Sequence, residues 1–244
     1  MTWSAGRLCG FDLETTSPDP ETARIVTACV VQVGDKRPTQ SRTWLSDVDG
    51  EEIPAEAAAI HGVTTDRARA EGSDLRQVVE EVLDALSAVV MAGVPLVVMN
   101  ARYDLTLLDR EARRYGMTPL TEGLGDITVI DPFVIDKQVD KFRRGSRKLA
   151  DLCAHYRVRL DGAHSADADA IAACRVAWRI AQQQPEIGNA SLSILHKQQI
   201  EWASSQAESL AAYFARTPGK EHQAATVRRE WPLVPFVPTP REGS

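Results

Sequence analysis

The stretch of residues 10–16, with the sequence GFDLETT, constrains the fold most, because it places two acids two positions apart at the end of an apolar run. If this run is a β-strand, the side chains of Asp12 and Glu14 point to the same face of a sheet, since strand residues alternate between faces. Two like charges held this close raise each other's pKa. A fold that keeps both ionised favours a cation between them, although a solvated strand end before the turn at 17–20 explains the pair equally well.

The composition is that of a globular protein with one domain and an appendage. The chain has 244 residues, of which 43% are hydrophobic and 25% charged, enough to bury a sizeable core. No run reaches the roughly 18 apolar residues of a membrane helix. The chain begins without an apolar signal core, and its cysteines form no C-x-x-C pair and predict buried thiols in a reducing compartment: Cys9, Cys29, Cys153 and Cys174. We therefore expect a cytoplasmic protein with no membrane partner.

The formal net charge of −6 argues against a protein that coats nucleic acid through its overall field. A local basic groove is still compatible with that charge. Six basic residues fall within a short segment that is a candidate for such a groove: Lys137, Lys141, Arg143, Arg144, Arg147 and Lys148. Taken alone, a run of this kind is more often a solvated loop.

The first 45 residues predict an antiparallel meander of three strands. Residues 7–14 and 24–33 have strand composition, and the second run, which includes IVTACVVQV, ends at a turn signal at 34–36. Residues 38–45 alternate well enough to return as a third strand. The first strand of this meander carries the acidic pair.

A buried central strand is predicted at residues 94–99, which are almost wholly apolar and follow an amphipathic helix that Ser73 or Asp74 can cap. This strand leads directly into the sequence NARYD at 100–104 and a further helix. Open α/β sheets place their ligands at the carboxyl ends of central strands, which makes Asp104 a candidate ligand. A plain helix-start acid stabilised by the helix dipole is the alternative.

Two histidines lie where a loop could bring them to a ligand. Residues 53–65 combine a short alanine-rich helix with a His-Gly corner at His61, for which a surface turn is the alternative interpretation. His164 precedes an alanine-rich helix that extends to about residue 183 and carries Asp169 in its first turns. A histidine five residues before an aspartate is common, so this pair means little by itself.

The chain divides into a domain at 1–185 and an extension at 186–244. Residues 189–216 predict one long helix, and a proline-containing irregular tail follows it. The sequence leaves open whether this tail packs back on the domain or serves as a short partner motif.

Together, the candidate acids supply four carboxylates from three segments: Asp12, Glu14, Asp104 and Asp169. That number suits a two-metal centre, in which hard cations roughly 3.5 to 4 Å apart clamp the attacking and leaving oxygens of a phosphoryl displacement. Magnesium is favoured over zinc because the ligands are carboxylates without a Cys/His set. His164 has an intrinsic pKa suited to a base that removes the proton of the attacking water.

The chain resembles the DnaQ-like (DEDDh) 3′-5′ exonucleases, a family that includes the epsilon proofreading subunit of bacterial DNA polymerase III. The resemblance rests on FDLETT at 11–16, NARYD at 100–104 and HSADADA at 164–170, and it extends over roughly residues 7–183. It implies an α/β, ribonuclease-H-like fold: a five-stranded mixed sheet flanked by helices, with its first three strands antiparallel. In this chain a C-terminal helical extension follows that fold.

The resemblance also implies that two Mg²⁺ ions, with Mn²⁺ as a substitute, are held by the four acids, and that His164 is the general base. The family spacing of five residues after the histidine selects Asp169 rather than Asp167. The chain departs from the family at Met99, where many members have a histidine, and at Tyr103, where phenylalanine is common. These departures affect local substrate contacts and leave the metal site intact.

Matching to the family further places six residues beside the terminal nucleotide: Leu13, Thr15, Thr16, Ile60, His61 and Asn100. Arg144 and Lys148 of the basic run are the predicted contacts to the nucleic-acid backbone, since an acidic protein needs a local positive path for phosphates.

The leading hypothesis is a metal-dependent exonuclease that releases nucleoside monophosphates from the 3′ end of DNA, with a DNA polymerase as a candidate partner. The sequence leaves open proofreading, DNA repair and the clearing of short fragments as its role. A ribonuclease acting on short RNA 3′ ends is the first alternative, because the same centre can cut RNA. A non-catalytic, polymerase-associated module that binds nucleic acid is the second. Such a module would be expected to have lost ligands, whereas all four acids and His164 are present.

Overall fold

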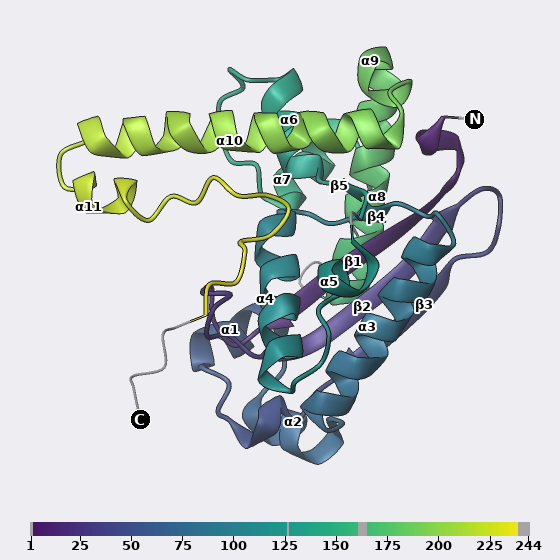
Figure 1. The fold of residues 1–244 in the computed structure, drawn as a ribbon, viewed down its shortest axis with the longest axis vertical. Coiled ribbons are helices and arrows are strands. Elements are labelled where there is room, and N and C mark those ends of the chain that lie inside the picture. Colours follow the sequence, from purple (N-terminus) through teal and green to yellow (C-terminus); the bar gives the residue numbers. More distant parts are fainter. Residues whose placement is uncertain (1, 126, 161–164, 239–244) are drawn as a thin grey trace.

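A five-stranded mixed sheet forms the centre of the computed structural model, which describes residues 2–125, 127–160 and 165–238 (Figure 1). The strand order is β3-β2-β1-β4-β5. The strands are β1 (Arg7–Thr15), β2 (Ile25–Gly34), β3 (Gln40–Leu45), β4 (Leu96–Val97) and β5 (Val129–Ile130). β2 pairs antiparallel with both β1 and β3, while β4 is parallel to β1 and to β5. The predicted mixed sheet with an antiparallel first half is confirmed.

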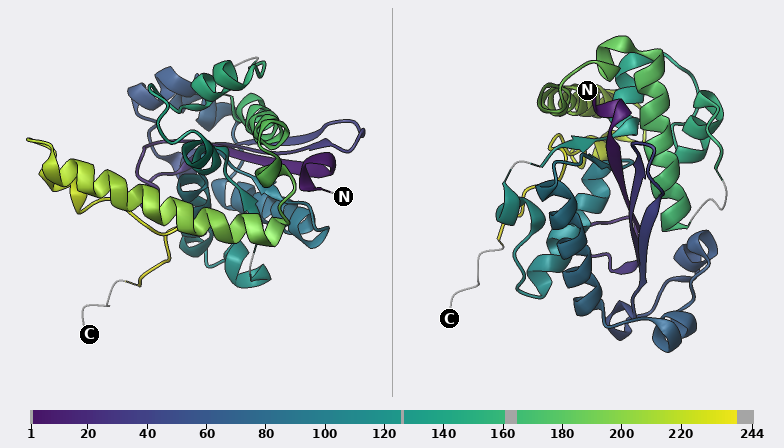
Figure 2. Two further views of the ribbon diagram at one scale, coloured as in Figure 1. Left: turned by 90° about the horizontal axis from the view of Figure 1, so that it is seen from above. Right: turned by 90° about the vertical axis from the view of Figure 1, so that its right-hand side faces the viewer.

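Helices cover both faces of this sheet, with α3 and α4 on one face and α7 and α8 on the other (Figure 2). The α-helices are α1 (Ala55–His61), α2 (Thr65–Glu71), α3 (Leu75–Met91), α4 (Ala101–Arg114), α5 (Leu120–Leu124), α6 (Pro132–Val139), α7 (Leu149–Tyr156), α8 (Ala166–Gln183), α9 (Pro185–Gly188), α10 (Leu192–Arg216) and α11 (Glu221–Ala224). Two short 3₁₀ helices lie at Trp3–Ala5 and Val48–Gly50. Within the described segments, no helix is long and apolar enough to cross a membrane.

The alternation of side chains along β1 decides which face carries the acids. Phe11 and Leu13 are buried in the core formed with α3 and α4. Gly10 lies on the opposite face, where a Cβ atom would come within 2.5 Å of the carbonyl oxygen of Ala170 on α8. Because only glycine allows this approach, α8 packs directly on β1. Asp12, two residues further along the strand, therefore faces α8 as well.

The three strands of the meander and helices α3 and α4 lie where the sequence pattern predicts them, whereas β4 and α6 differ from the prediction. β4 contributes only two residues to the ladder, although the surrounding predicted strand is buried. Helix α6 was not predicted; it begins after Asp131, whose side chain accepts the N–H of Phe133, with Pro132 at the first helical position. The four cysteines are free and buried, as the sequence predicted.

The C-terminal extension packs against the domain through both its helix and its tail. Gln199 of α10 is fully buried; its side-chain amide donates to the carbonyl of Val129 in β5 (2.9 Å). The tail then returns along α4, where the N–H of Val234 donates to Oγ1 of Thr106 (2.9 Å). Arg110 in turn donates to the carbonyl of Val234 (3.0 Å). Of the two alternatives for the tail, the structure shows packing back on the domain.

Candidate active site

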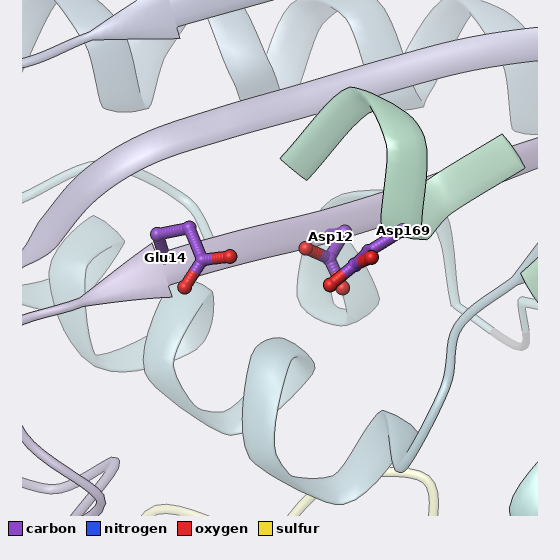
Figure 3. A group of neighbouring side chains, drawn as sticks. All are labelled: Asp12, Glu14 and Asp169. Atoms are coloured by element: carbon purple, nitrogen blue, oxygen red, sulfur yellow. The ribbon is translucent and has the colours of Figure 1, made fainter. Parts of the chain in front are cut away.

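Three of the predicted acids form one cluster at the interface of β1 and α8 (Figure 3). Asp12 and Glu14 project from β1, and Asp169 comes from the first turn of α8. Each offers one carboxylate oxygen, and these oxygens all lie within 4.8 Å of one another. The strand's two-residue alternation and the close contact at Gly10 bring the three side chains together.

Asp104 lies beside this cluster at the start of α4. It is 4% exposed, and its Oδ1 accepts the backbone N–H of Leu13 at 3.1 Å. This bond ties the first turn of α4 to the residue between Asp12 and Glu14. The charge of Asp104 also contributes to raising the pKa of Asp12, which places the fourth acid within electrostatic reach of the cluster.

Electrostatic repulsion dominates the cluster. The pKa of Asp12 lies well above its usual range, first because the carboxyl is buried and then because Asp104, Asp169 and Glu14 surround it. Burial and the charge of Asp169 raise the pKa of Glu14 to about 7. Among the described residues, no hydrogen-bond donor reaches the side chain of either acid. Several carboxylate oxygens that converge in one place are the environment that a hard divalent cation prefers, so the residues fit a metal centre.

The remaining predicted member, His164, lies outside the described residues. The helix that follows it is described from its first turn, and there two aspartates point differently. Asp169 joins the cluster, while Asp167 is exposed and does not. Of these two aspartates, the structure therefore brings only Asp169 to the cluster.

The His61 corner adjoins the end of β1. Gly62, with a φ of 75°, ends α1 and donates its N–H to the carbonyl of Ala58 (2.8 Å). His61 is half-buried, and its Nδ1 accepts the N–H of Val63 (3.2 Å). Burial lowers the pKa of His61, and a contact with the Thr15 backbone opposes this shift. The neighbouring Ile60 side chain is exposed, so the corner presents an apolar side chain to solvent.

The two threonines after the acidic pair differ in what their hydroxyl groups contact. The hydroxyl of Thr15 hydrogen-bonds to that of Tyr103, which donates to the carbonyl of Ser17. Tyr103 thus links α4 to the end of β1. Thr16 is buried, and its Oγ1 accepts the N–H of Arg24 (2.9 Å). The Thr16 side chain is therefore used to close the turn between β1 and β2.

Sequence reasoning missed Asp131, which fixes the start of α4. Its buried carboxylate accepts the N–H groups of Asn100 and Ala101 (both 3.0 Å) and the indole N–H of Trp231 (3.1 Å). Asn100 itself adopts a left-handed conformation, with a φ of 60°. Because Asp131 holds these N–H groups, it sets the direction of the helix that carries Asp104. An Asp-Pro pair after a strand indicates a helix cap. The distant N–H groups that the Asp131 carboxylate accepts could not be inferred from the sequence.

The basic run is divided between structural and exposed positions. Arg143 and Arg147 donate to the same carboxylate oxygen of Asp136 (2.6 and 2.7 Å), which is fully buried. These two arginines therefore hold the loop between α6 and α7 in place. Arg144 and Lys148, the predicted backbone contacts, are both exposed.

Several solved structures of exonuclease I share this fold. One is 18% identical, with a TM-score of 0.66, and the match covers 75% of this chain and 42% of that chain. A zinc-bound complex of E. coli exonuclease I with single-stranded DNA is 17% identical, also with a TM-score of 0.66, and the match covers 85% and 45% of the two chains. The present chain thus spans less than half the length of these proteins, and at this identity the likeness shows the fold.

A search of curated protein sequences gives no match. The family model described as "Exonuclease" (RNase_T) does match, over residues 9–177. That range contains β1 from residue 9 onward, α4 and the first turn of α8, and with them all four acids of the site. A carboxylate cluster of this geometry is the site expected of a metal-dependent nuclease. The extent of the match shows that the chain belongs to this exonuclease family.

Proposed function

We propose that the protein is a metal-dependent 3′-5′ exonuclease that removes nucleoside monophosphates from the end of a DNA strand. The observation that carries this proposal is the convergence of Asp12, Glu14 and Asp169 within 4.8 Å, with Asp104 adjoining them. Two Mg²⁺ ions, or Mn²⁺ in their place, would be held by these four carboxylates. When bound, the cations supply positive charge that offsets the negative charge developing on the scissile phosphate.

The chain's own residues supply binding and proton transfer. His164, five residues before Asp169, acts as the general base that removes a proton from the attacking water. The backbone at Leu13 and Thr15 and the exposed Ile60 at the His61 corner surround the terminal nucleotide. Ile60 offers an apolar surface on which the terminal base can pack.

Single-stranded DNA is the substrate form that the related structures favour. Exonuclease I of E. coli has been solved in complexes with dT13 and dA16 oligonucleotides. The protein in each of these two complexes shares the present fold with a TM-score of 0.63. A similar strand would bring its 3′ end to the carboxylates here. Exposed Arg144 and Lys148 are proposed to contact its phosphates.

The proposal is tested with a 5′-labelled oligonucleotide, whose shortening from the 3′ end is followed with Mg²⁺, with a chelator and with a 3′-phosphate block. Asp169→Asn should abolish trimming. Asp167→Asn is the matched control, because this exposed aspartate lies in the same helical turn and outside the cluster, and it should leave trimming intact. Equal trimming by wild type and Asp169→Asn, or loss of label from the 5′ end alone, would refute the proposal.

The role of His164 is tested separately by His164→Ala. Loss of a general base should lower kcat by about 10²- to 10⁴-fold while KM for the oligonucleotide changes little. Measuring matched DNA and RNA oligonucleotides with the same enzyme decides between the DNA exonuclease and the ribonuclease alternative. If RNA is trimmed faster than DNA, the protein is a ribonuclease acting on RNA 3′ ends.

A further inference from the structure

A groove extends along the side of the domain where the C-terminal extension packs, between α6 and α10. It consists of two adjoining cavities of about 230 and 350 Å³, which share Lys137, Gln206 and Leu210 in their walls. The first cavity begins at Asn100 and Arg102, at the N-terminus of α4, and the tail closes its other side. We call the combined feature the α6–α10 groove. Neither the acidic cluster nor the family match accounts for it, because α10 lies beyond residue 177.

The walls of the α6–α10 groove carry two lysines, Lys137 and Lys141, for which the described residues provide no ion pair. Lys137 is partly buried, and its ammonium lies 5.0 Å from the centre of the Phe133 ring. Burial and the nearby charges of Arg147 and Arg102 lower the pKa of Lys137, and the charge of Asp131 opposes this shift. Exposed Lys141 continues the basic wall into the second cavity. Such a wall favours an anionic ligand.

Among the described residues that line the first cavity, the acid is Asp131, whose charge offsets part of the positive charge of Lys137 and Arg102. The two oxygens of Asp131 accept N–H groups from the starts of α4 and α6 and from Trp231. Its carboxylate is therefore saturated by donors inside the protein. The groove as a whole presents its lysines to an incoming ligand.

Two aromatic rings stand at the far end of the groove. Phe142 is 89% exposed and Tyr213 is 52% exposed, and both line the second cavity. The ammonium of Lys220 lies 5.9 Å from the centre of the Tyr213 ring and adds one more cation. Lysines interleaved with exposed aromatic rings are the arrangement that binds phosphates and stacks unpaired bases.

We propose that the α6–α10 groove binds single-stranded nucleic acid, namely the segment immediately 5′ of the nucleotide held at the acidic cluster. This inference rests on the proposed function. Asn100, at the mouth of the groove, is four residues from Asp104, or about 6 Å along a helix axis. A strand can therefore pass from the groove to the acids around the start of α4. A duplex does not fit the aromatic end, because its paired bases are already stacked and cannot reach the two rings.

Binding is measured without catalysis, by fluorescence anisotropy of a labelled oligothymidylate of about 20 nucleotides in EDTA over a range of salt concentrations. The double variant Lys137→Gln/Lys141→Gln removes two phosphate contacts. It should lower the slope of log Kd against log salt by about 1.4, since each contact to a single strand contributes about 0.7. Lys197→Gln is the matched control: this exposed lysine lies on α10 away from both cavities, and its slope should equal that of wild type.

Stacking is tested by Tyr213→Ala, which should raise Kd for oligothymidylate by about fivefold or more. Ile194→Ala is the control for lost apolar surface on the same helix, because Ile194 is also exposed and lies outside the groove. Thermal unfolding of each variant establishes that it is folded. The inference would be overturned if the lysine variant kept the Kd and salt slope of the wild type, or if the wild type bound blunt duplex as tightly as oligothymidylate. It would also be overturned if the variants changed the oligomeric state of the protein and left its affinity for oligothymidylate unchanged.

The two proposals fail in different ways. Hydrolysis of thymidine 5′-p-nitrophenyl phosphate by wild-type protein with Mg²⁺ reports on the acidic cluster, because this small ester cannot extend into the α6–α10 groove. Absence of that activity counts against the proposed function, whereas the anisotropy result in EDTA alone decides the groove.

Discussion

The substitution Glu14→Gln separates the electrostatic cost of the acidic cluster from its capacity to bind metal. Glu14 is the acid of the cluster whose pKa is best suited to titration, because burial and Asp169 raise it from 4.5 to about 7. A raised pKa means that the folded state favours the protonated carboxyl. The stability due to this carboxyl is therefore fully present below pH 4.5 and is lost as the pH rises through about 7.

The size of this loss follows from the same two values. At about 1.36 kcal/mol per pH unit, a shift from 4.5 to about 7 corresponds to at most about 3.4 kcal/mol. The Glu14 side chain is partly exposed, so solvent screening reduces the expected loss to about 2 kcal/mol. Glutamine is nearly isosteric and does not ionise, so Glu14→Gln should not show this part of the pH dependence.

Urea unfolding at pH 5 and pH 8 in EDTA measures the difference. The free energy of unfolding of the wild type should fall by about 1.5 kcal/mol more than that of Glu14→Gln between these two pH values, because part of the loss already occurs below pH 5. Mg²⁺ at about 100 times its Kd should then stabilise the wild type at pH 8 by about 2.7 kcal/mol and the variant by clearly less. Equal pH dependence of the two proteins, or equal stabilisation of both by Mg²⁺, would refute the assignment of Glu14 to a cluster of mutually repelling carboxylates that binds a cation.

Three further substitutions test how the site is supported. Gly10→Ala should push α8 off β1, lowering the melting temperature and weakening Mg²⁺ binding measured by calorimetry, because its Cβ would lie 2.5 Å from a backbone oxygen. Asp131→Ala should lower the free energy of unfolding by about 3 kcal/mol, since buried N–H groups lose their acceptor; urea unfolding would measure this. Arg24→Ala should cost about 1.5 kcal/mol, because fully buried Glu111 loses one of its two arginine partners (3.2 Å) and keeps Arg114 (3.3 Å), whereas exposed Arg67→Ala should cost at most about 0.5 kcal/mol in the same assay.

The acids on β1 could be predicted because their arrangement is local. The two-residue period of a strand fixes the face that Asp12 and Glu14 share, and no distant residue is needed to infer it. The sheet followed for the same reason, since its first three strands are neighbours in sequence. The position of Asp104 also followed from a local rule, that a helix starts at the carboxyl end of a central strand.

The contacts that the sequence did not reveal join residues far apart in the chain. Asp131 receives its donors from residues about 30 positions before it and 100 after it. The basic run looked uniform, yet Arg143 and Arg147 pair with Asp136 on α6, a helix that was not predicted. A charge that is paired and a charge that is free have the same sequence signature, so only the structure could separate them.

Asp131 also shows that the C-terminal extension is part of what supports the site. The backbone N–H of Asp131 donates to the buried side-chain carbonyl of Gln199 on α10 (2.7 Å), and its carboxylate accepts the indole N–H of Trp231 in the tail (3.1 Å). The same carboxylate holds the first two N–H groups of α4. One side chain therefore links the extension to the helix that carries Asp104. Because that helix must present its acid to the residues of β1, the segment beyond the family match contributes to the geometry of the acidic cluster as well as to the wall of the α6–α10 groove.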